Sequence, residues 1–208
     1  MIIGGASGYL GAAIISGKSA LYSGSRYVEI MTTKPHSMIL STHQPELITS
    51  YKISDFQKKI ISYKNLLIGP GMSNDDWSKK IFIKVKKYLR SQSTKINCII
   101  DGGFLSILSK DPYKYDGWIM TPHIGEAAQL LKKKSSDIEA DRLKAAKELQ
   151  EKYDTNEIES ITISPLSKAL NNAYSIIILS VLAGLFGWFV LGPIIIGEDF
   201  FWENKDPN

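Results

Sequence analysis

The stretch whose residue types are best suited to chemistry is Thr121-Pro122-His123-Ile124-Gly125-Glu126, at the end of a short apolar run. Pro122 fixes φ and ends a strand, and Gly125 frees the backbone just before a helix-forming series. A strand–loop–helix junction of this kind offers unpaired N–H groups and the positive end of a helix dipole, which suit an anionic ligand. His123 stands in the loop, where its ring can donate to that ligand. An ordinary strand-to-helix turn with a surface histidine explains the same residues, so both interpretations stay open.

A second candidate ligand loop is rich in glycine and lies near the N-terminus. Gly5, Gly8 and Gly11 follow the strand stub Met1-Ile2-Ile3 and lead into a helix. Backbone N–H groups of such a turn can approach a phosphate. The spacing Gly-x-x-Gly-x-x-Gly differs from the dinucleotide pattern Gly-x-Gly-x-x-Gly, and a tight packing turn explains it equally well.

Two further loops of this type follow apolar runs. Gly69-Pro70-Gly71 ends the run 65–68, and Asp101-Gly102-Gly103 ends the run 96–100. A carboxylate followed by glycines at the carboxyl end of a strand is where open α/β sheets keep their ligands. Asp101 is therefore a candidate ligand residue, and no residue is assigned to a metal.

The elements that position these loops alternate over residues 1–153. Strands are predicted near 1–3, 27–32, 65–69, 96–101 and 118–121, and helices over 12–23, 56–62, 77–91 and, as one long helix, 136–153. The long helix is expected to carry Glu148 and Lys152 as an i,i+4 ion pair, and residues 33–50, which contain two prolines, are expected to be irregular. Strands alternating with helices indicate βαβ units and a largely parallel sheet. The carboxyl ends of parallel strands meet at one edge, so the loops are predicted to converge there.

Composition narrows the class of protein. The chain has 208 residues and a net charge of +4, and most of its lysines follow helical surfaces, which indicates solvated faces and no nucleic-acid partner. A single cysteine, Cys98, excludes an internal disulfide framework and indicates a reducing compartment. The N-terminus has no charged region followed by a long apolar core, so no signal peptide is predicted.

The C-terminal part of the chain has a different character. Residues 154–174 are predicted to be a linker, in which 158–163 has the pattern of one more strand, and 198–208 form a polar tail. Between them, residues 175–197 carry no charge, a length sufficient to span the hydrocarbon core of a membrane. Aromatic residues flank this segment, as in a membrane-interface belt. We expect a transmembrane helix that anchors the preceding domain on the cytoplasmic side; a helix buried against the α/β domain is the alternative.

Residues 1–153 resemble the ADP-dependent NAD(P)H-hydrate dehydratases, which have a ribokinase-like α/β fold. The likeness covers about three quarters of the chain. It implies a mostly parallel sheet flanked by helices, ADP or ATP as the nucleotide with Mg²⁺ as its accompanying ion, and NAD(P)H hydrate or another nicotinamide or adenine nucleotide as ligand. It implies substrate contacts at Ala12, Gly71 and His123. The residues that carry it are Ile2-Ile3-Gly4-Gly5, Gly8-x-x-Gly11-Ala12, Ile68-Gly69-Pro70-Gly71-Met72 with Trp77, Asp101 with Leu105, Thr121-Pro122-His123-x-Gly125-Glu126-Ala127-Ala128, and Glu139-x-Asp141-Arg142-Leu143.

The chain departs from the family pattern at positions that bear on catalysis. The family has Asp-Ala-Asp-Ala-Leu where this chain has Asp101-Gly102-Gly103-Phe104-Leu105, so the second carboxylate is missing, and it has a proline where Ile124 stands. After Tyr153 the sequence contains neither the family's Lys-Gly-x-Gly nucleotide loop nor a Gly-Ser-Gly-Asp-like anion hole with its catalytic aspartate. No catalytic residue is therefore assigned, and the fold is predicted to be incomplete, or truncated, on its C-terminal side.

Two classes of function follow. The first is a dehydratase-type enzyme that is active only when another chain supplies the nucleotide half. The second is a catalytically dead, membrane-anchored subunit with a structural or nucleotide-binding role.

Overall fold

Short runs of large apolar residues form the strands of this protein. The computed structural model describes residues 1–92, 96, 98–155 and 157–158. Within these ranges seven parallel strands make one sheet in the order β3-β2-β1-β4-β5-β6-β7. Their bounds are β1 Ile2–Ile3, β2 Glu29–Met31, β3 Ile48–Ser50, β4 Leu66–Ile68, β5 Cys98–Ile100, β6 Trp118–Met120 and β7 Glu157–Ile158.

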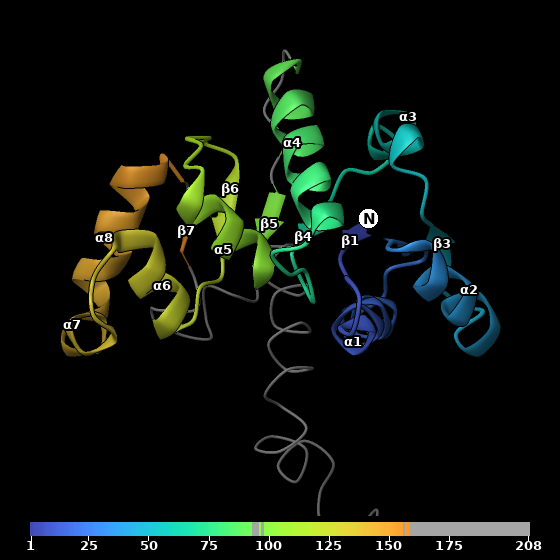
Figure 1. Ribbon diagram of the computed structural model, residues 1–208, viewed down its shortest axis with the longest axis horizontal. Helices are drawn as coiled ribbons and strands as arrows, with labels where there is room; N and C mark the ends of the chain where they lie inside the picture. The colour runs from blue at the N-terminus through green and yellow to red at the C-terminus, as the bar shows by residue number, and fades with distance from the viewer. Residues whose placement is uncertain (93–95, 97, 156, 159–208) are drawn as a thin grey trace, which may run out of the picture.

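Helices connect the strands and lie on both faces of the sheet (Figure 1). Figure 1 shows β3 and α2 at one end of the sheet and β7 with α6, α7 and α8 at the other. The helices are α1 Leu10–Tyr22, α2 Lys34–His43, α3 Phe56–Ile60 after the 3₁₀ turn η1 Ile53–Asp55, α4 Asp76–Arg90, α5 Gly103–Lys110, α6 Ile124–Leu131, α7 Ser135–Ala140 and α8 Arg142–Tyr153.

Alternation along each strand divides the core into two layers. Ile3 and Ile68 point to the face covered by α4 and α5, whereas Ile2 and Leu67 point to the face covered by α1. The first layer is the larger and contains an edge-to-face pair, Phe104 and Trp118, with ring centroids 5.7 Å apart. Burial of these apolar side chains fixes the register of the strands, and with it the positions of the loops at their ends.

The five predicted strands and the parallel sheet are confirmed, but the expectation for residues 33–50 is wrong. This stretch forms α2 and then β3, which pairs in parallel with β2. Pro35 lies in the first turn of α2. N–H groups in the first turn make no hydrogen bond within the helix, so the absence of an N–H in proline costs nothing there. A proline that the sequence suggested as a breaker therefore starts a helix.

The predicted long helix over 136–153 is also wrong, because it is divided into α7 and α8. Asp141 separates them with φ −148° and ψ 85°, and its carboxylate caps α8 by accepting from the Lys144 N–H at 2.9 Å. The predicted ion pair of Glu148 and Lys152 does not form. Glu148 pairs with Lys133, which lies in the loop between α6 and α7, and the Lys152 ammonium donates to the Leu130 carbonyl.

The C-terminal predictions fall largely outside the described residues. β7 begins within the predicted linker 154–174, at the start of the candidate strand 158–163. The predicted span 175–197, the tail 198–208 and the expected incompleteness of the fold on that side lie outside the residues that the structure describes. Among the helices it does describe, none has the length and apolar character to cross a membrane.

Candidate functional site

The glycine loops meet at the carboxyl edge of the sheet. β1, β4, β5 and β6 are consecutive neighbours, so the loops that follow them lie next to one another. Backbone hydrogen bonds join the first two loops: the Gly5 N–H donates to the Pro70 carbonyl at 2.9 Å, and the Ala6 N–H donates to the Gly71 carbonyl at 2.7 Å. The predicted convergence is thus present as direct contact between loops.

The second and third loops are in equally close contact. The Asp101 N–H donates to the Ile68 carbonyl at 3.0 Å, which holds Asp101 at the end of the neighbouring strand. Gly69 has φ +124°, and a Cβ at this position would lie 1.7 Å from the Asp101 carbonyl oxygen. Only glycine fits this position, because its φ is positive and the Asp101 backbone lies in direct contact with it.

Ala12 and Gly71, two of the predicted substrate contacts, lie against each other. A Cβ on Gly71 would be 3.1 Å from the Ala12 Cβ and 2.4 Å from the Tyr9 carbonyl oxygen, and the φ of Gly71 is +66°. Ala12 is half-buried in the first turn of α1. The second loop therefore touches the start of α1 directly.

The three glycines of the first loop differ in what surrounds them. Gly5 is buried; its carbonyl accepts from the Thr32 hydroxyl at 2.6 Å, and an added Cβ would meet Ala13 and Thr32 at 3.0 Å. Gly8 and Gly11 are exposed, and a Cβ on either would meet nothing within 4 Å. The packing interpretation accounts for Gly5, whereas the space beside Gly8 and Gly11 is open to a ligand.

The first turn of α1 is suited to an anion. Its N-cap residue makes no side-chain capping bond, and no acidic residue lies in that turn. The N–H groups that begin a helix have no intrahelical partner and carry a partial positive charge. In this structure they adjoin the open space at Gly8 and Gly11.

His123 occupies a more specific position than the sequence suggested. It is the N-cap of α6, and its Nδ1 accepts from the N–H groups of Gly125 at 3.0 Å and Glu126 at 3.3 Å. Glu126 completes a capping box by accepting from the His123 N–H at 2.9 Å. The expectation of unpaired N–H groups at this junction is therefore wrong for Gly125 and Glu126.

This capping arrangement determines which ring nitrogen of His123 can donate. Because Nδ1 accepts two N–H bonds, the ring proton of the neutral imidazole is on Nε2. Nε2 lies 3.5 Å from Glu126 Oε1, and 70% of the side chain is exposed. His123 can thus offer an Nε2–H donor to a ligand while Nδ1 holds the helix.

Two carboxyl groups lie beside His123, and the pKa of each is raised by burial. Asp101 Oδ1 accepts from the Thr121 hydroxyl at 2.9 Å; desolvation raises the pKa of Asp101 although this bond and His123 oppose the shift. Desolvation also raises the pKa of Glu126, and the nearby Asp101 adds to the effect. Carboxyl groups whose pKa is raised by burial, lying together at a sheet edge, mark a candidate ligand site.

The sequence assigned no site role to the side chains of Glu126, Thr121 or Tyr9, although Thr121 and Glu126 stand in the stretch with which the sequence analysis begins. Glu126 stands three residues after the capping His123, but the sequence signature of a capping box has Ser, Thr, Asp or Asn at the N-cap position, so His123 gave no such signal. No local signal assigns a role to Thr121 or Tyr9 either, because their positions depend on which strands are neighbours. Among the described residues, no group of three His, Cys, Asp or Glu side chains could hold a metal ion.

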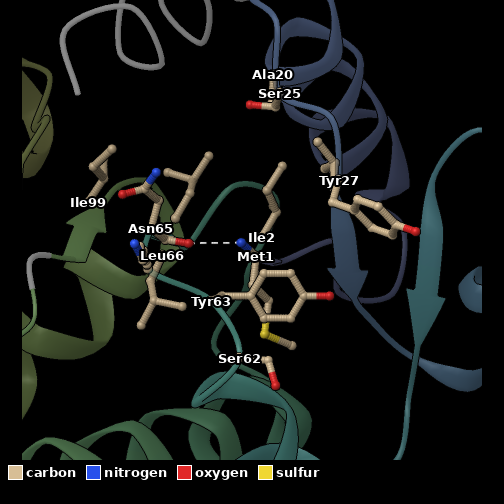
Figure 2. A pocket seen from close by; sticks show the side chains of 13 residues that line it. Met1, Ile2, Ala20, Ser25, Tyr27, Ser62, Tyr63, Asn65, Leu66 and Ile99 are labelled. Carbon is tan, nitrogen blue, oxygen red and sulfur yellow. Dashed lines mark hydrogen bonds between the residues drawn. The ribbon is translucent and has the colours of Figure 1, made fainter. Parts of the chain in front are cut away.

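A cavity of about 210 Å³ lies at the opposite, amino edge of the sheet. Tyr27 and Tyr63 are among the side chains that line it (Figure 2), and the Met1 amino group donates to the Asn65 carbonyl at 2.8 Å. Its wall includes the first residues of β1 and β4. Open α/β sheets bind ligands outside the carboxyl ends of their strands, so the loop edge is the candidate site and this cavity is not.

Comparison with known proteins points to one family. The family model described as NAD(P)H-hydrate dehydratase matches residues 1–156. The bifunctional NAD(P)H-hydrate repair enzyme Nnr of Coxiella burnetii is 32% identical over 155 residues, which cover 74% of this chain and 30% of that enzyme. An ADP-dependent (S)-NAD(P)H-hydrate dehydratase of Listeria monocytogenes is 28% identical over 134 residues, which cover 62% of this chain and 48% of that one. The chain thus spans well under two thirds of each relative.

Solved structures support the ribokinase-like fold. A ribokinase-like superfamily protein from Enterococcus faecalis superimposes with a TM-score of 0.67 at 20% identity, covering 88% of this chain and 69% of that one. The ADP/ATP-dependent NAD(P)H-hydrate dehydratase of Bacillus subtilis, co-crystallised with ATP and Mg²⁺ and soaked with CoA, superimposes with a TM-score of 0.57 at 23% identity. That match covers 75% of this chain and 56% of the Bacillus protein.

Proposed function

The chain belongs to the NAD(P)H-hydrate dehydratase family, and from this premise we propose that its loop edge binds a hydrated nicotinamide dinucleotide. The observation that carries the proposal is the meeting of Ala12, Gly71 and the open Gly8–Gly11 turn, with Asp101 and His123 at the neighbouring strand ends. A nucleotide-binding site needs N–H groups that bind phosphate, a few polar side chains in fixed positions, and loops whose backbone can approach the ligand closely. This edge offers all three.

We assign each group a binding role from its chemistry. The first turn of α1 faces the phosphate charge with its uncapped N–H groups. His123 donates from Nε2 to an oxygen of the ligand, since its Nδ1 already accepts from α6. Asp101 accepts from a ligand hydroxyl when ionised, and its raised pKa makes this role depend on pH.

ADP or ATP is proposed as the second ligand, because relatives of this chain bear these nucleotides in their names. Mg²⁺ binds phosphate oxygens together with one or two carboxylates, and Asp101 is a carboxylate at the loop edge. The ion would therefore bind together with the nucleotide. It would supply positive charge at the phosphates, in addition to the partial positive charge of the N–H groups in the first turn of α1.

We further propose that this chain alone does not dehydrate NAD(P)H hydrate. Residues 154–208 contain no Lys-Gly-x-Gly and no Gly-Ser-Gly-Asp sequence, and the second carboxylate of the Asp101 loop is replaced by Gly103. Loss of a general base or an anion hole typically lowers a rate by about 10²–10⁴-fold. Turnover of NADH hydrate with ADP or ATP by the isolated chain, at a rate comparable to that of an intact relative, would refute this.

Calorimetric titration tests the binding proposal with a matched pair of histidine variants. Asn at position 123 keeps an N-cap acceptor but removes the Nε2–H donor, so His123→Asn separates binding from helix stability. Loss of one hydrogen bond to a charged group is worth about 1.5–3 kcal/mol, or roughly a 10- to 150-fold rise in the Kd for the dinucleotide. His43→Ala, at the exposed last turn of α2, is the control and should leave the Kd unchanged. Equal Kd values for the wild type and His123→Asn would remove His123 from the site.

The second candidate function is a membrane-anchored subunit that binds nucleotide or supports a partner chain without catalysis. Its motive is the uncharged segment 175–197 with aromatic residues on both sides. In a membrane-association assay, Phe186→Arg at the middle of that segment should weaken association, because a central Arg costs about 2.5–3.5 kcal/mol on insertion scales. Phe186→Leu is the matched control, and undiminished association of the Arg variant would argue against a span.

A partner that supplies or replaces the nucleotide half is part of both candidates. Co-purification of a second protein that restores ADP-dependent turnover would favour the enzyme. A partner that leaves the complex inactive while dinucleotide binding persists would favour the subunit.

A further inference from the structure

Tyr9 lies at the start of α1, between the two loops that the proposed function assigns to the substrate. Its N–H donates to the Ala6 carbonyl at 2.9 Å, which closes the glycine turn. A Cβ on Gly71 would lie 2.4 Å from the Tyr9 carbonyl oxygen and 3.1 Å from the Tyr9 Cβ. The backbone and Cβ of Tyr9 are therefore held firmly against the second loop.

The side chain of Tyr9, in contrast, is left open. It is 57% exposed, although large apolar side chains near the sheet are mostly buried. In the part of the chain that the structure describes, no hydrogen bond holds its hydroxyl, and its neighbour Gly8 faces open space. Packing therefore accounts for the backbone of Tyr9 and leaves its ring unexplained.

The position of Tyr9 on α1 relates it to the predicted substrate contacts. Tyr9 and Ala12 are three residues apart at the first turn, so they lie on the same side of the helix, and both approach Gly71 within the distances given above. Because Tyr9 is the N-cap residue of α1, next to the turn that is proposed to bind phosphate, a heterocycle attached to that phosphate through a ribose would lie within reach of its exposed ring. Aromatic stacking accepts any base, because every base has a π face.

We propose that Tyr9 is a stacking platform for the heterocycle of the nucleotide bound at the loop edge. This inference rests on the proposed function, and it adds the residue that recognises the planar part of the ligand. The nicotinamide and the adenine ring share the required chemistry, and the choice of ligands in the experiment separates them.

The experiment is calorimetric titration of the full chain with nicotinamide mononucleotide, AMP and ribose 5-phosphate. Base–aromatic stacking predicts a rise of about 5- to 150-fold in the Kd of Tyr9→Ala for at least one of the two base-bearing ligands. Tyr9→Phe keeps the ring and should bind as the wild type does. The affinity for ribose 5-phosphate, which has no heterocycle, should not change in either variant.

Tyr22, at the other end of α1 and 82% exposed, provides the matched control, and Tyr22→Ala should leave all three affinities unchanged. A larger effect on nicotinamide mononucleotide than on AMP identifies the nicotinamide ring as the stacked group, and the reverse identifies adenine. Unchanged affinities for both base-bearing ligands in Tyr9→Ala, or an equal loss for ribose 5-phosphate, would overturn the platform and leave the proposed function standing. A folded wild type that binds none of the three ligands at millimolar concentration would overturn both.

Discussion

Comparing Gly71→Ala with Gly8→Ala separates two effects: the steric contact between the second loop and the start of α1, and the conformational freedom of glycine. Gly71 and Gly8 both have positive φ, +66° and +84°, so an alanine at either is strained by the backbone. That strain amounts to about 1–2 kcal/mol for an L-residue in the left-handed region. Both variants also lose the same unfolded-chain entropy, so this term cancels between them.

The surroundings of the two glycines differ. At Gly71 the new Cβ would lie 2.4 Å from the Tyr9 carbonyl oxygen and 3.1 Å from the Ala12 Cβ, whereas at Gly8 it would meet nothing within 4 Å. Overpacking typically adds about 1–3 kcal/mol. Gly71→Ala should therefore lower the free energy of unfolding by about 2–5 kcal/mol and Gly8→Ala by about 1–2 kcal/mol.

Thermal unfolding followed by circular dichroism measures the difference. At about 2–4 °C per kcal/mol for a chain of this size, Gly8→Ala should lower Tm by about 2–8 °C and Gly71→Ala by at least a further 2–4 °C. Dinucleotide affinity should also fall more in Gly71→Ala, because the second loop must move away from α1. Equal Tm values for the two variants would show that Gly71 does not contact α1 as described.

The remaining predictions concern charge and protonation. Glu29 is 3% exposed and accepts from Lys59 at 2.7 Å, and although its burial opposes this, the bonds to its partners lower its pKa below the ordinary 4.5. Its contribution to stability is therefore full above pH 4.5 and is lost as the pH falls through the lowered pKa. In denaturant unfolding at a series of pH values, the free energy of unfolding of Glu29→Gln should fall less steeply with acid than that of the wild type. Parallel plots of this free energy against pH for the two proteins would contradict the prediction. Burial raises the pKa of Asp101 above the ordinary 3.8, so its contribution is full below pH 3.8 and lost as the pH rises through the raised pKa. The free energy of unfolding of Asp101→Asn, relative to that of the wild type, should accordingly increase as the pH rises from acidic to neutral. A difference between the two proteins that stays constant with pH would refute the raised pKa. In ¹⁵N spectra, the neutral ring of His123 should be the Nε2–H tautomer, since Nδ1 accepts two N–H bonds, and an Nδ1–H tautomer would contradict the capping geometry.

The arrangement of the loops was predictable because each apolar run ends in a residue that stops a strand. Pro122, Gly69 and Gly102 mark such ends, and a parallel sheet brings them to one edge. The sequence also identified the position of His123 at a strand-to-helix junction. It could not show that the ring caps α6, because an N-cap histidine has the same local pattern as a free loop histidine.

The features that the sequence did not predict include β3 and the break between α7 and α8, and each has a physical reason. β3 has only three residues and is an edge strand with Ile48 exposed, so it lacks the alternation that marks a half-buried strand. The division of α7 from α8 was hidden because Ile138, Ala145 and Leu149 are all buried and keep a helical spacing across Asp141. The spacing of apolar residues shows which side chains are buried. It does not change when the backbone breaks between two helices whose buried residues keep that spacing, so the break cannot be detected from it.

The most direct test of the central claim is to titrate the ¹⁵N-labelled chain with NADH and follow the backbone amide signals by NMR. The claim that the loop edge is the ligand site predicts concentration-dependent shifts at Gly8, Gly71, Asp101 and His123, with a common Kd. A folded protein whose spectrum does not change at millimolar ligand would contradict it. So would shifts confined to Tyr27, Tyr63 and the other residues of the cavity at the amino edge of the sheet.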